Sequence, residues 1–145
     1  MTNTPGPSFE VTGQQLVDCG GLQFEATFRA PAGATLRVLG DVEGRPTELL
    51  RFDDFIEGPH YHVPASGPAI QFDQAKLGEP LTWFILQLSE RLTDVLTEAG
   101  FASVLAHVDA VAVADHAGDI RKAMEECVPD GYTRVPGVGL RRSAE

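Results

Sequence analysis

The N-terminal half of the chain alternates hydrophobic and polar side chains with a period of two. The clearest case is residues 22–30, "LQFEATFRA", in which every second residue from Leu22 to Ala30 is apolar. Successive side chains of a strand point to opposite faces, so this segment predicts a half-buried strand. Turn sequences at 31–33 and 43–46 separate it from two more predicted strands, over residues 35–42 and 47–55. Residues 60–63 and 69–73 predict a fourth and a fifth short strand.

The strand predicted over residues 47–55 has no clean apolar face. Strict alternation places Glu48 and Asp54 on the face that carries Leu50 and Phe52. The other face then carries Leu49, Arg51, Asp53 and Phe55. Charged side chains on both faces mark this strand as a place where chemistry can occur.

The period changes to that of a helix after residue 80. Apolar residues recur at three- and four-residue spacing, at Leu81, Phe84, Ile85, Leu88, Leu92, Val95, Leu96 and Ala99. Pro80 suits a first helical position and Gly100 a position just beyond a helix end. The pattern therefore predicts one continuous helix over residues 80–99.

The remaining segments complete an α+β prediction. Residues 115–127 predict a second helix, and residues 103–113 fit either helix or buried strand, with helix favoured. Strands followed by helices are typical of α+β proteins. We therefore expect an antiparallel sheet of four or five strands, over about residues 9–73, packed by C-terminal helices over about residues 80–99 and 115–127. Residues 9–129 form the single predicted domain, between a flexible tail at 1–8 and an irregular tail at 130–145.

Composition and charge narrow the class of protein. The 145 residues carry a net charge of −10, and residues 1–78 and 79–145 contribute −5 each. Such diffuse acidity disfavours nucleic-acid binding, because it repels phosphate backbones. The sequence shows no signal peptide, no membrane-spanning run and no CxxC motif, so we expect a cytoplasmic protein with Cys19 and Cys127 as buried thiols.

Candidate chemistry is concentrated in "RFDDFIEGPHYH", residues 51–62. His60 and His62 are two residues apart on a predicted strand, so both imidazoles point to the same face. If residues 56–59 close a hairpin, Arg51 and Asp53 reach that face, with Asp54 and Glu57 nearby.

Three interpretations of this motif stay open. The first is a metal site with His60, His62 and Asp53 as ligands for Zn, Fe, Mn or Ni. The second is a metal-free acid–base pair, in which Arg51 stabilises an anionic transition state. The third is a purely structural hairpin.

Two resemblances rest on these residues. "GPHYH" resembles the first half of a cupin metal motif, but the glutamate that would follow is replaced by "VPASG", and a helical pattern begins where a cupin continues in strands. "RFDDFIEGPHYH", followed by the predicted helix at 80–99, is similar in order and spacing to small bacterial toxin-like and uncharacterised proteins. That resemblance implies a ribonuclease-like active site formed by Arg51, Asp53, His60 and His62.

The incomplete motif set leads to two expectations about function. The first is a small acidic accessory protein without a cofactor of its own, which binds another protein subunit or a second copy of itself. Trp83, Arg141 and Arg142 are its predicted contact residues. The second is a small HxH-dependent hydrolase, either metal-dependent or a metal-free phosphodiesterase, that uses Arg51, Asp53, His60 and His62.

Overall fold

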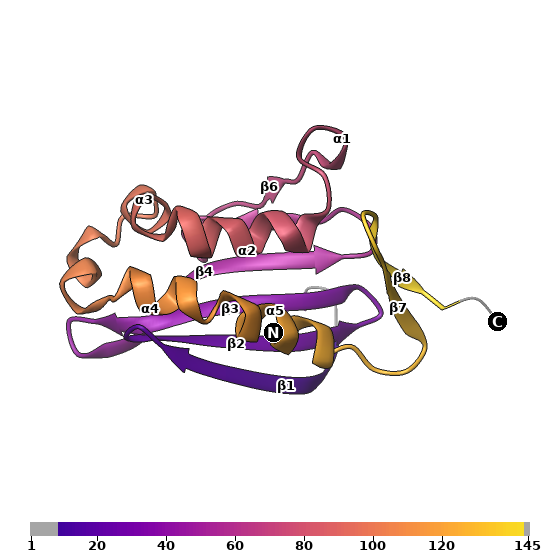
Figure 1. The fold of residues 1–145 in the computed structure, drawn as a ribbon, viewed down its shortest axis with the longest axis horizontal. Coiled ribbons are helices and arrows are strands. Elements are labelled where there is room, and N and C mark those ends of the chain that lie inside the picture. The colour runs from indigo at the N-terminus through magenta and orange to yellow at the C-terminus, as the bar shows by residue number, and fades with distance from the viewer. Residues whose placement is uncertain (1–8, 144–145) are drawn as a thin grey trace, which may run out of the picture.

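The computed structural model describes residues 9–143 and has the predicted α+β architecture (Figure 1). Its main sheet is antiparallel, with its strands adjacent in chain order: β1 (Glu10–Cys19), β2 (Leu22–Ala30), β3 (Gly33–Val42), β4 (Arg45–Phe55), β5 (His60–His62) and β6 (Ile70–Gln71). The five predicted strands correspond to β2–β6. The sheet has six strands because residues 10–19, for which no strand was predicted, form β1. The tail predicted over residues 1–8 lies outside the described residues.

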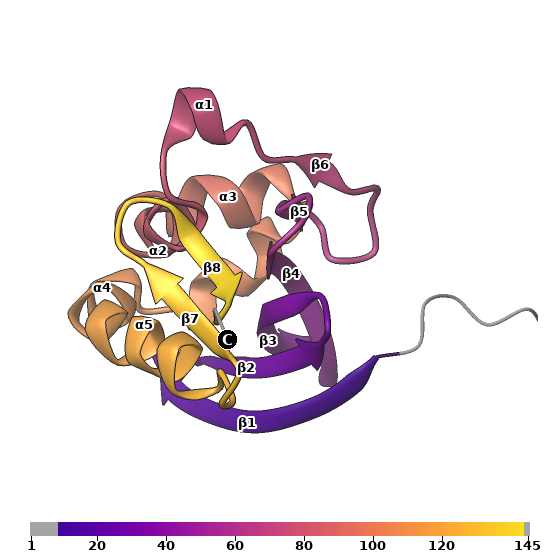
Figure 2. The same cartoon turned by 90° about the vertical axis from the view of Figure 1, so that its right-hand side faces the viewer.

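Helices follow the sheet and pack on one of its faces, except for α1 (Gln74–Leu77), which stands out beyond α2 (Pro80–Glu90) (Figures 1 and 2). The others are α3 (Leu92–Glu98), the 3₁₀ helix η1 (Ala102–His107), α4 (Ala110–Asp115) and α5 (Ala117–Glu126). Residues 103–113, which fit helix or strand from sequence, are thus helical apart from a short break between η1 and α4. Between residues 9 and 143 no helix is long and apolar enough to cross a membrane.

The core lies between this helical layer and the apolar face of the sheet. Phe24, Ala26 and Phe28 are at most 1% exposed, and they stand in register with Val38, Leu36 and Ala34 of β3. Phe84 of α2 packs on Phe52 of β4 with ring centroids 5.1 Å apart. The alternation in residues 22–30 therefore has the predicted cause: one face of β2 is buried beneath the helices.

Strand β1 contains a bulge that the sequence pattern did not predict. Its pairing with β2 shifts between Thr12 and Gln15, and Gly13 adopts a φ of 68°. A Cβ built on Gly13 would lie 2.4 Å from the backbone oxygen of Cys127, at the end of α5. The bulge therefore presses β1 against the helical layer, at a point where only glycine fits.

Replacing Gly13 with Ala is expected to lower the free energy of unfolding by about 2–3 kcal/mol, because a left-handed backbone and a steric overlap act together. Gly44 is the matched control, since its φ of 81° is similar but nothing lies within 4 Å of its Cβ position. Gly44→Ala should cost only about 1 kcal/mol. Chemical denaturation of both variants measures the difference, and equal costs would contradict the proposed contact with Cys127.

The single helix predicted over residues 80–99 is wrong: the structure has two helices that meet at Arg91. This residue leaves the helical region, with φ −130° and ψ 16°. Figure 1 shows α3 turned across the direction of α2. Leu92, Val95 and Leu96 remain buried after the turn. The break lets the same apolar stripe follow the core, and the guanidinium of Arg91 bridges it by bonding to Gln87 and Glu98.

The irregular C-terminal tail predicted over residues 130–145 is also wrong for the residues that are described. Residues 132–142 form a hairpin of β7 (Tyr132–Val135) and β8 (Gly139–Arg142). Leu140 is 1% exposed, and the Tyr132 ring lies 4.5 Å from that of Phe28. The hairpin is stabilised by contacts with the main sheet, which short-range sequence patterns do not encode.

Strand β4 carries a bulge that changes the predicted faces. Leu50 pairs with Val38 and Glu48 with Leu39, so Leu49 is the extra residue. A bulge of one residue reverses the faces beyond it. Glu48 therefore lies on the polar face with Arg51, and not with Leu50 and Phe52 as strict alternation predicted.

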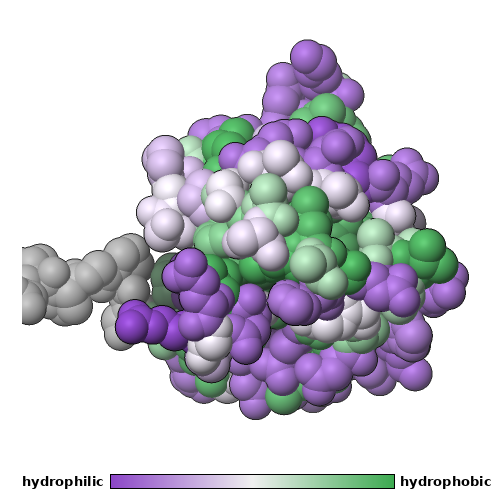
Figure 3. Space-filling model, turned by 90° about the vertical axis from the view of Figure 1, so that its left-hand side faces the viewer, coloured by the Kyte–Doolittle hydropathy of each residue, from purple (hydrophilic) through white to green (hydrophobic). Residues whose placement is uncertain are grey.

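The end of the molecule at the left of Figure 1 carries the β1–β2 and β3–β4 turns and η1. Figure 3 shows that hydrophobic side chains gather in the middle of this end, within a hydrophilic surround. Partly buried Phe101, Leu105 and Val108 pack against the core from η1 and its flanks. This end is therefore the apolar one, whereas the polar residues of interest lie on the sheet.

Candidate metal centre

The face of the sheet opposite the helices carries two rows of polar side chains. The register places Thr27, Thr35, Asp53 and His60 in one row across β2, β3, β4 and β5. The second row runs parallel to it through Glu25, Arg37, Arg51 and His62. We call these residues the polar face. Thr27, Thr35 and Asp53 are nevertheless at most 4% exposed.

Asp53, His60 and His62 form a compact cluster on this face, as the hairpin prediction required. One carboxylate oxygen of Asp53, Oδ2, lies 3.0 Å from Nε2 of His60 and 3.4 Å from Nε2 of His62. One ligand atom from each residue lies within 4.8 Å of the others. The β4–β5 pairing of Asp53 with His60 and Arg51 with His62 produces this convergence.

The second nitrogen of each imidazole is held by the backbone. Nδ1 of His60 is 2.9 Å from the carbonyl oxygen of Gly58, and Nδ1 of His62 is 2.8 Å from that of Gly67. A carbonyl oxygen only accepts hydrogen bonds, so each Nδ1 carries a proton. In a neutral ring Nε2 then carries an unprotonated lone pair, and the lone pairs of both histidines point at the same carboxylate. These acceptor atoms repel one another unless a proton or a metal cation lies between them.

Asp53 is anchored by its other oxygen. The Thr35 hydroxyl donates to Oδ1 at 2.7 Å. Burial opposes ionisation of Asp53, but hydrogen bonds from His60 and Thr35 outweigh it, so the pKa of Asp53 lies below its usual value. The hydrogen bond to Asp53 is also the main reason that the pKa of His60 is raised. Asp53 is thus a fixed anion with one oxygen free for the histidines.

Arg51, the fourth predicted catalytic residue, lies beside the cluster but is bound elsewhere. Its Nε and Nη2 donate to Glu48 at 2.8 and 2.7 Å. Glu48 also accepts from Arg37, which bonds to Glu25 at 2.8 Å. These four residues form a ladder of alternating charge along the polar face. The ladder fixes the position of Arg51 without placing its guanidinium on Asp53.

Two residues expected near the cluster are not part of it. Asp54 points to the helical side, where it pairs with Arg134 of β7. Glu57 is exposed in the β4–β5 turn. The set that the structure brings together is therefore Asp53, His60 and His62, with Arg51 alongside.

The predicted partner-binding residues lie away from this face. The Trp83 ring packs against Tyr61 and Phe72, with centroids 5.0 and 5.5 Å apart. Arg141 is half-buried on β8 and bonds to the carbonyl of Leu140, whereas Arg142 is exposed. Trp83 thus fastens β5 and β6 to α2 and supports the strand that carries both histidines.

Sequence reasoning missed the residues that orient the cluster. Thr35 was not singled out, and neither were the carbonyls of Gly58 and Gly67. The alternation in residues 22–30 did signal that Glu25, Thr27 and Arg29 face away from the core. Only the strand register shows that this polar face continues through Thr35 to Asp53.

The pH dependence of stability in the metal-free protein follows from the two pKa shifts. The depressed pKa of Asp53 adds stability above about pH 4, its unfolded value, and this is lost as the pH falls through the folded pKa. The raised pKa of His60 adds stability below about pH 6.5, and this is lost as the pH rises through the folded pKa. In EDTA the thermal unfolding midpoint should therefore fall above pH 6.5, and His60→Gln should reduce this fall. A variant curve parallel to wild type would contradict the Asp53–His60 contact.

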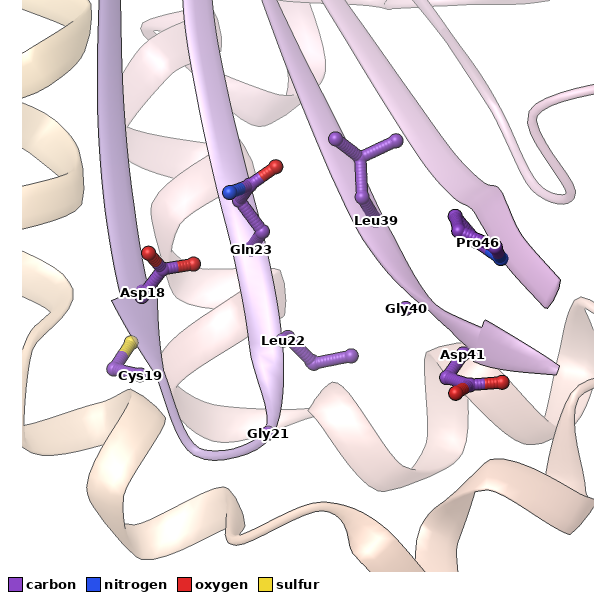
Figure 4. Close-up of a pocket in the computed structure, with 9 residues that line it drawn as sticks. All are labelled: Asp18, Cys19, Gly21, Leu22, Gln23, Leu39, Gly40, Asp41 and Pro46. Atoms are coloured by element: carbon purple, nitrogen blue, oxygen red, sulfur yellow. The ribbon is translucent and has the colours of Figure 1, made fainter. Parts of the chain in front are cut away.

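A hollow of about 530 Å³ at the apolar end offers less chemistry (Figure 4). Figure 4 shows Asp18 and Asp41 on opposite sides of it, with Cys19 at its edge. Burial and the negative charges of Asp119 and Asp18 raise the pKa of Cys19, so its thiol stays protonated and weakly nucleophilic. With no histidine among its lining residues, this hollow lacks the convergent set found on the polar face.

The fold and the cluster define an α+β protein with a two-histidine, one-carboxylate set on an antiparallel sheet. The chain belongs to the family DUF7700, a domain of unknown function, whose model matches residues 16–124. That match includes Asp53, His60 and His62 and ends before the C-terminal hairpin. No curated protein and no solved structure matches the chain.

Proposed function

We propose that this protein binds a divalent transition metal through Asp53, His60 and His62 and uses it as a hydrolytic centre. The observation that carries the proposal is the convergence of two Nε2 atoms on one carboxylate oxygen, while both Nδ1 atoms are held by backbone carbonyls. Ligating histidines usually donate their second ring N–H to a carbonyl or carboxylate, which fixes the tautomer that binds metal.

The ligand chemistry favours Zn, Fe, Mn or Ni over magnesium or calcium, which prefer oxygen ligands. Three protein ligands leave at least one coordination position for water or substrate, as in catalytic zinc sites. A metal in this position would lower the pKa of its water, and the resulting hydroxide would attack a phosphorus or carbonyl carbon. Bound there, the metal would supply this nucleophile, and the leaving oxygen would take up a proton from solvent as its bond breaks.

The direct test is metal binding by the untagged, metal-stripped protein. Titration with Zn²⁺, Mn²⁺, Ni²⁺ and anaerobic Fe²⁺, followed by elemental analysis after gel filtration, should give about one metal per chain. Hydrolysis of model phosphate and carboxylate esters should appear only after loading and disappear with a chelator. Binding of no metal at micromolar concentration would overturn the proposal.

The 3.0 Å contact between His60 and Asp53 supports a second candidate, metal-free acid–base catalysis by the same cluster. In that case activity survives chelation, and both His60→Gln and His62→Gln abolish it. Cleavage of an RNA dinucleotide in EDTA separates the two candidates.

Binding of a protein partner remains a third proposal, supported by the exposure of Arg142. The packing of Trp83 against Tyr61 and Phe72 leaves less of its indole for a partner than the sequence led us to expect. We therefore place the metal-dependent function first.

A further inference from the structure

The polar face contains a cavity of about 540 Å³ next to the row that leads to Asp53. The bulged segment of β1 and residues of β2 and β3 line it, among them Glu25, Thr27, Arg29 and Arg37. The β1 bulge explains why the cavity exists. The β1–β2 register shifts between Thr12 and Gln15, and the cavity is lined by the residues at this shift.

Two buried polar atoms in this wall have no hydrogen-bond partner among residues 9–143. They are Oγ1 of Thr27 and Nε of Arg29, from neighbouring positions on the same face of β2. Thr27 is 4% exposed. A buried donor without a partner costs about 1–3 kcal/mol, so such a pair calls for an explanation beyond folding.

The charges around the cavity favour an anion. Glu25 is already neutralised by Arg37 at 2.8 Å. Arg29 then contributes a surplus positive charge, in a chain whose net charge is −10. The N–H of Arg29 can only donate, and the Thr27 hydroxyl is able to donate, so the missing partner is an acceptor such as an oxyanion.

The cavity lies on the same face of the sheet as the metal-ligand cluster, two strands away from it. Thr27 and Asp53 are two strands apart in the same row, with Thr35 between them. Neighbouring strands are about 4.8 Å apart, so the two side chains are about 10 Å apart. The cavity does not extend to the cluster, because Thr35 is fully buried and neither Thr35 nor Asp53 lines it, so an anion held at Thr27 would lie on the same face as the histidines without contacting them.

We infer that Thr27 and Arg29 form the anion-binding subsite for a small organic phosphate or carboxylate. This inference goes beyond the proposed function, and the binding of the anion does not require the metal. Both atoms are shielded from water in the free protein, so a rotamer change of the long Arg29 side chain accompanies binding.

The test is binding of inorganic phosphate, with acetate as the second probe, by isothermal titration calorimetry in EDTA. We expect saturable binding by the wild-type protein, weakened about tenfold or more in Arg29→Gln, because a hydrogen bond to a charged group is lost. Tighter binding of phosphate assigns a phosphate group, and tighter binding of acetate assigns a carboxylate. Arg45→Gln is the matched control, since this exposed arginine lies outside the cavity.

Thr27→Val separates binding from folding. Valine has the shape of threonine without the hydroxyl, and that hydroxyl has no hydrogen-bond partner among residues 9–143. The variant should therefore keep or raise the unfolding midpoint while it weakens anion binding several-fold. A fall in the midpoint with unchanged binding would overturn the inference.

The outcome for the anion is distinguishable from the outcome for the metal. Anion binding that persists in a protein unable to bind metal would support the subsite and reject the metal centre. Absence of saturable phosphate and acetate binding, or equal weakening in Arg29→Gln and Arg45→Gln, would overturn the subsite and leave the metal centre standing.

Discussion

Zinc at about 100 times its dissociation constant is expected to raise the thermal unfolding midpoint by roughly 5–10 °C, and alanine at His60 or His62 should remove this shift. Binding to the folded state alone at that concentration adds about 2.7 kcal/mol, which corresponds to this range for a chain of this size. Each histidine supplies one of three ligands, so its loss should weaken zinc binding about 100-fold or more. Differential scanning fluorimetry with and without zinc measures both effects.

His116→Ala is the matched control for these variants. Nδ1 of His116 also lies 2.8 Å from a backbone carbonyl oxygen, that of Ala112, but His116 is exposed on the helical layer. Its loss should leave the zinc-dependent shift unchanged. Asp53→Asn should reduce the shift, because it removes the anionic ligand at nearly constant shape. A zinc shift that persists in His60→Ala, or that vanishes in His116→Ala, would place the metal elsewhere.

Arg134→Ala is expected to lower the free energy of unfolding at pH 7 by about 3–5 kcal/mol, because it leaves a buried carboxylate without its partner. The side chain of Asp54 is 2% exposed and pairs with Arg134 across the junction between the main sheet and the C-terminal hairpin. Arg134 also donates to the backbone oxygen of Met124 at 3.2 Å. Urea denaturation measures the loss.

The same variant has a defined pH dependence. Burial raises the pKa of Asp54 even with Arg134 beside it. A raised pKa adds stability that is present below about pH 4, its unfolded value, and lost as the pH rises through the folded pKa. Removing the positive charge raises this pKa further, so the gap between variant and wild type should widen from pH 4 to pH 7.

Arg142→Ala serves as the control in the same hairpin. Arg142 is exposed, and its side chain donates to the backbone oxygen of Pro31 over a long distance of 3.4 Å. Its removal should change the free energy of unfolding by no more than about 0.5 kcal/mol. Equal effects of the two substitutions would mean that the Asp54–Arg134 pair does not fasten the hairpin.

The metal-ligand set was predictable because its geometry is mostly local. His60 and His62 are two residues apart on a strand, so their side chains point to the same face. The short turn before them then brings this face of β5 next to Asp53 on β4. The groups that orient the set were not predictable. Thr35 approaches Asp53 only through strand pairing, and Gly67 reaches His62 only when the loop after β5 folds back.

The sequence by itself determined the α+β class, the buried face of β2 and the shared face of the two histidines, since each follows from the period of side chains along one segment. The tertiary structure alone decided three other features: Glu48 crosses to the polar face at the Leu49 bulge, the apolar stripe after Pro80 bends at Arg91, and residues 132–142 dock through Arg134. In each case a contact between distant segments outweighed the local pattern, because burying apolar surface and pairing a buried charge contribute more free energy than the local preference of a few residues.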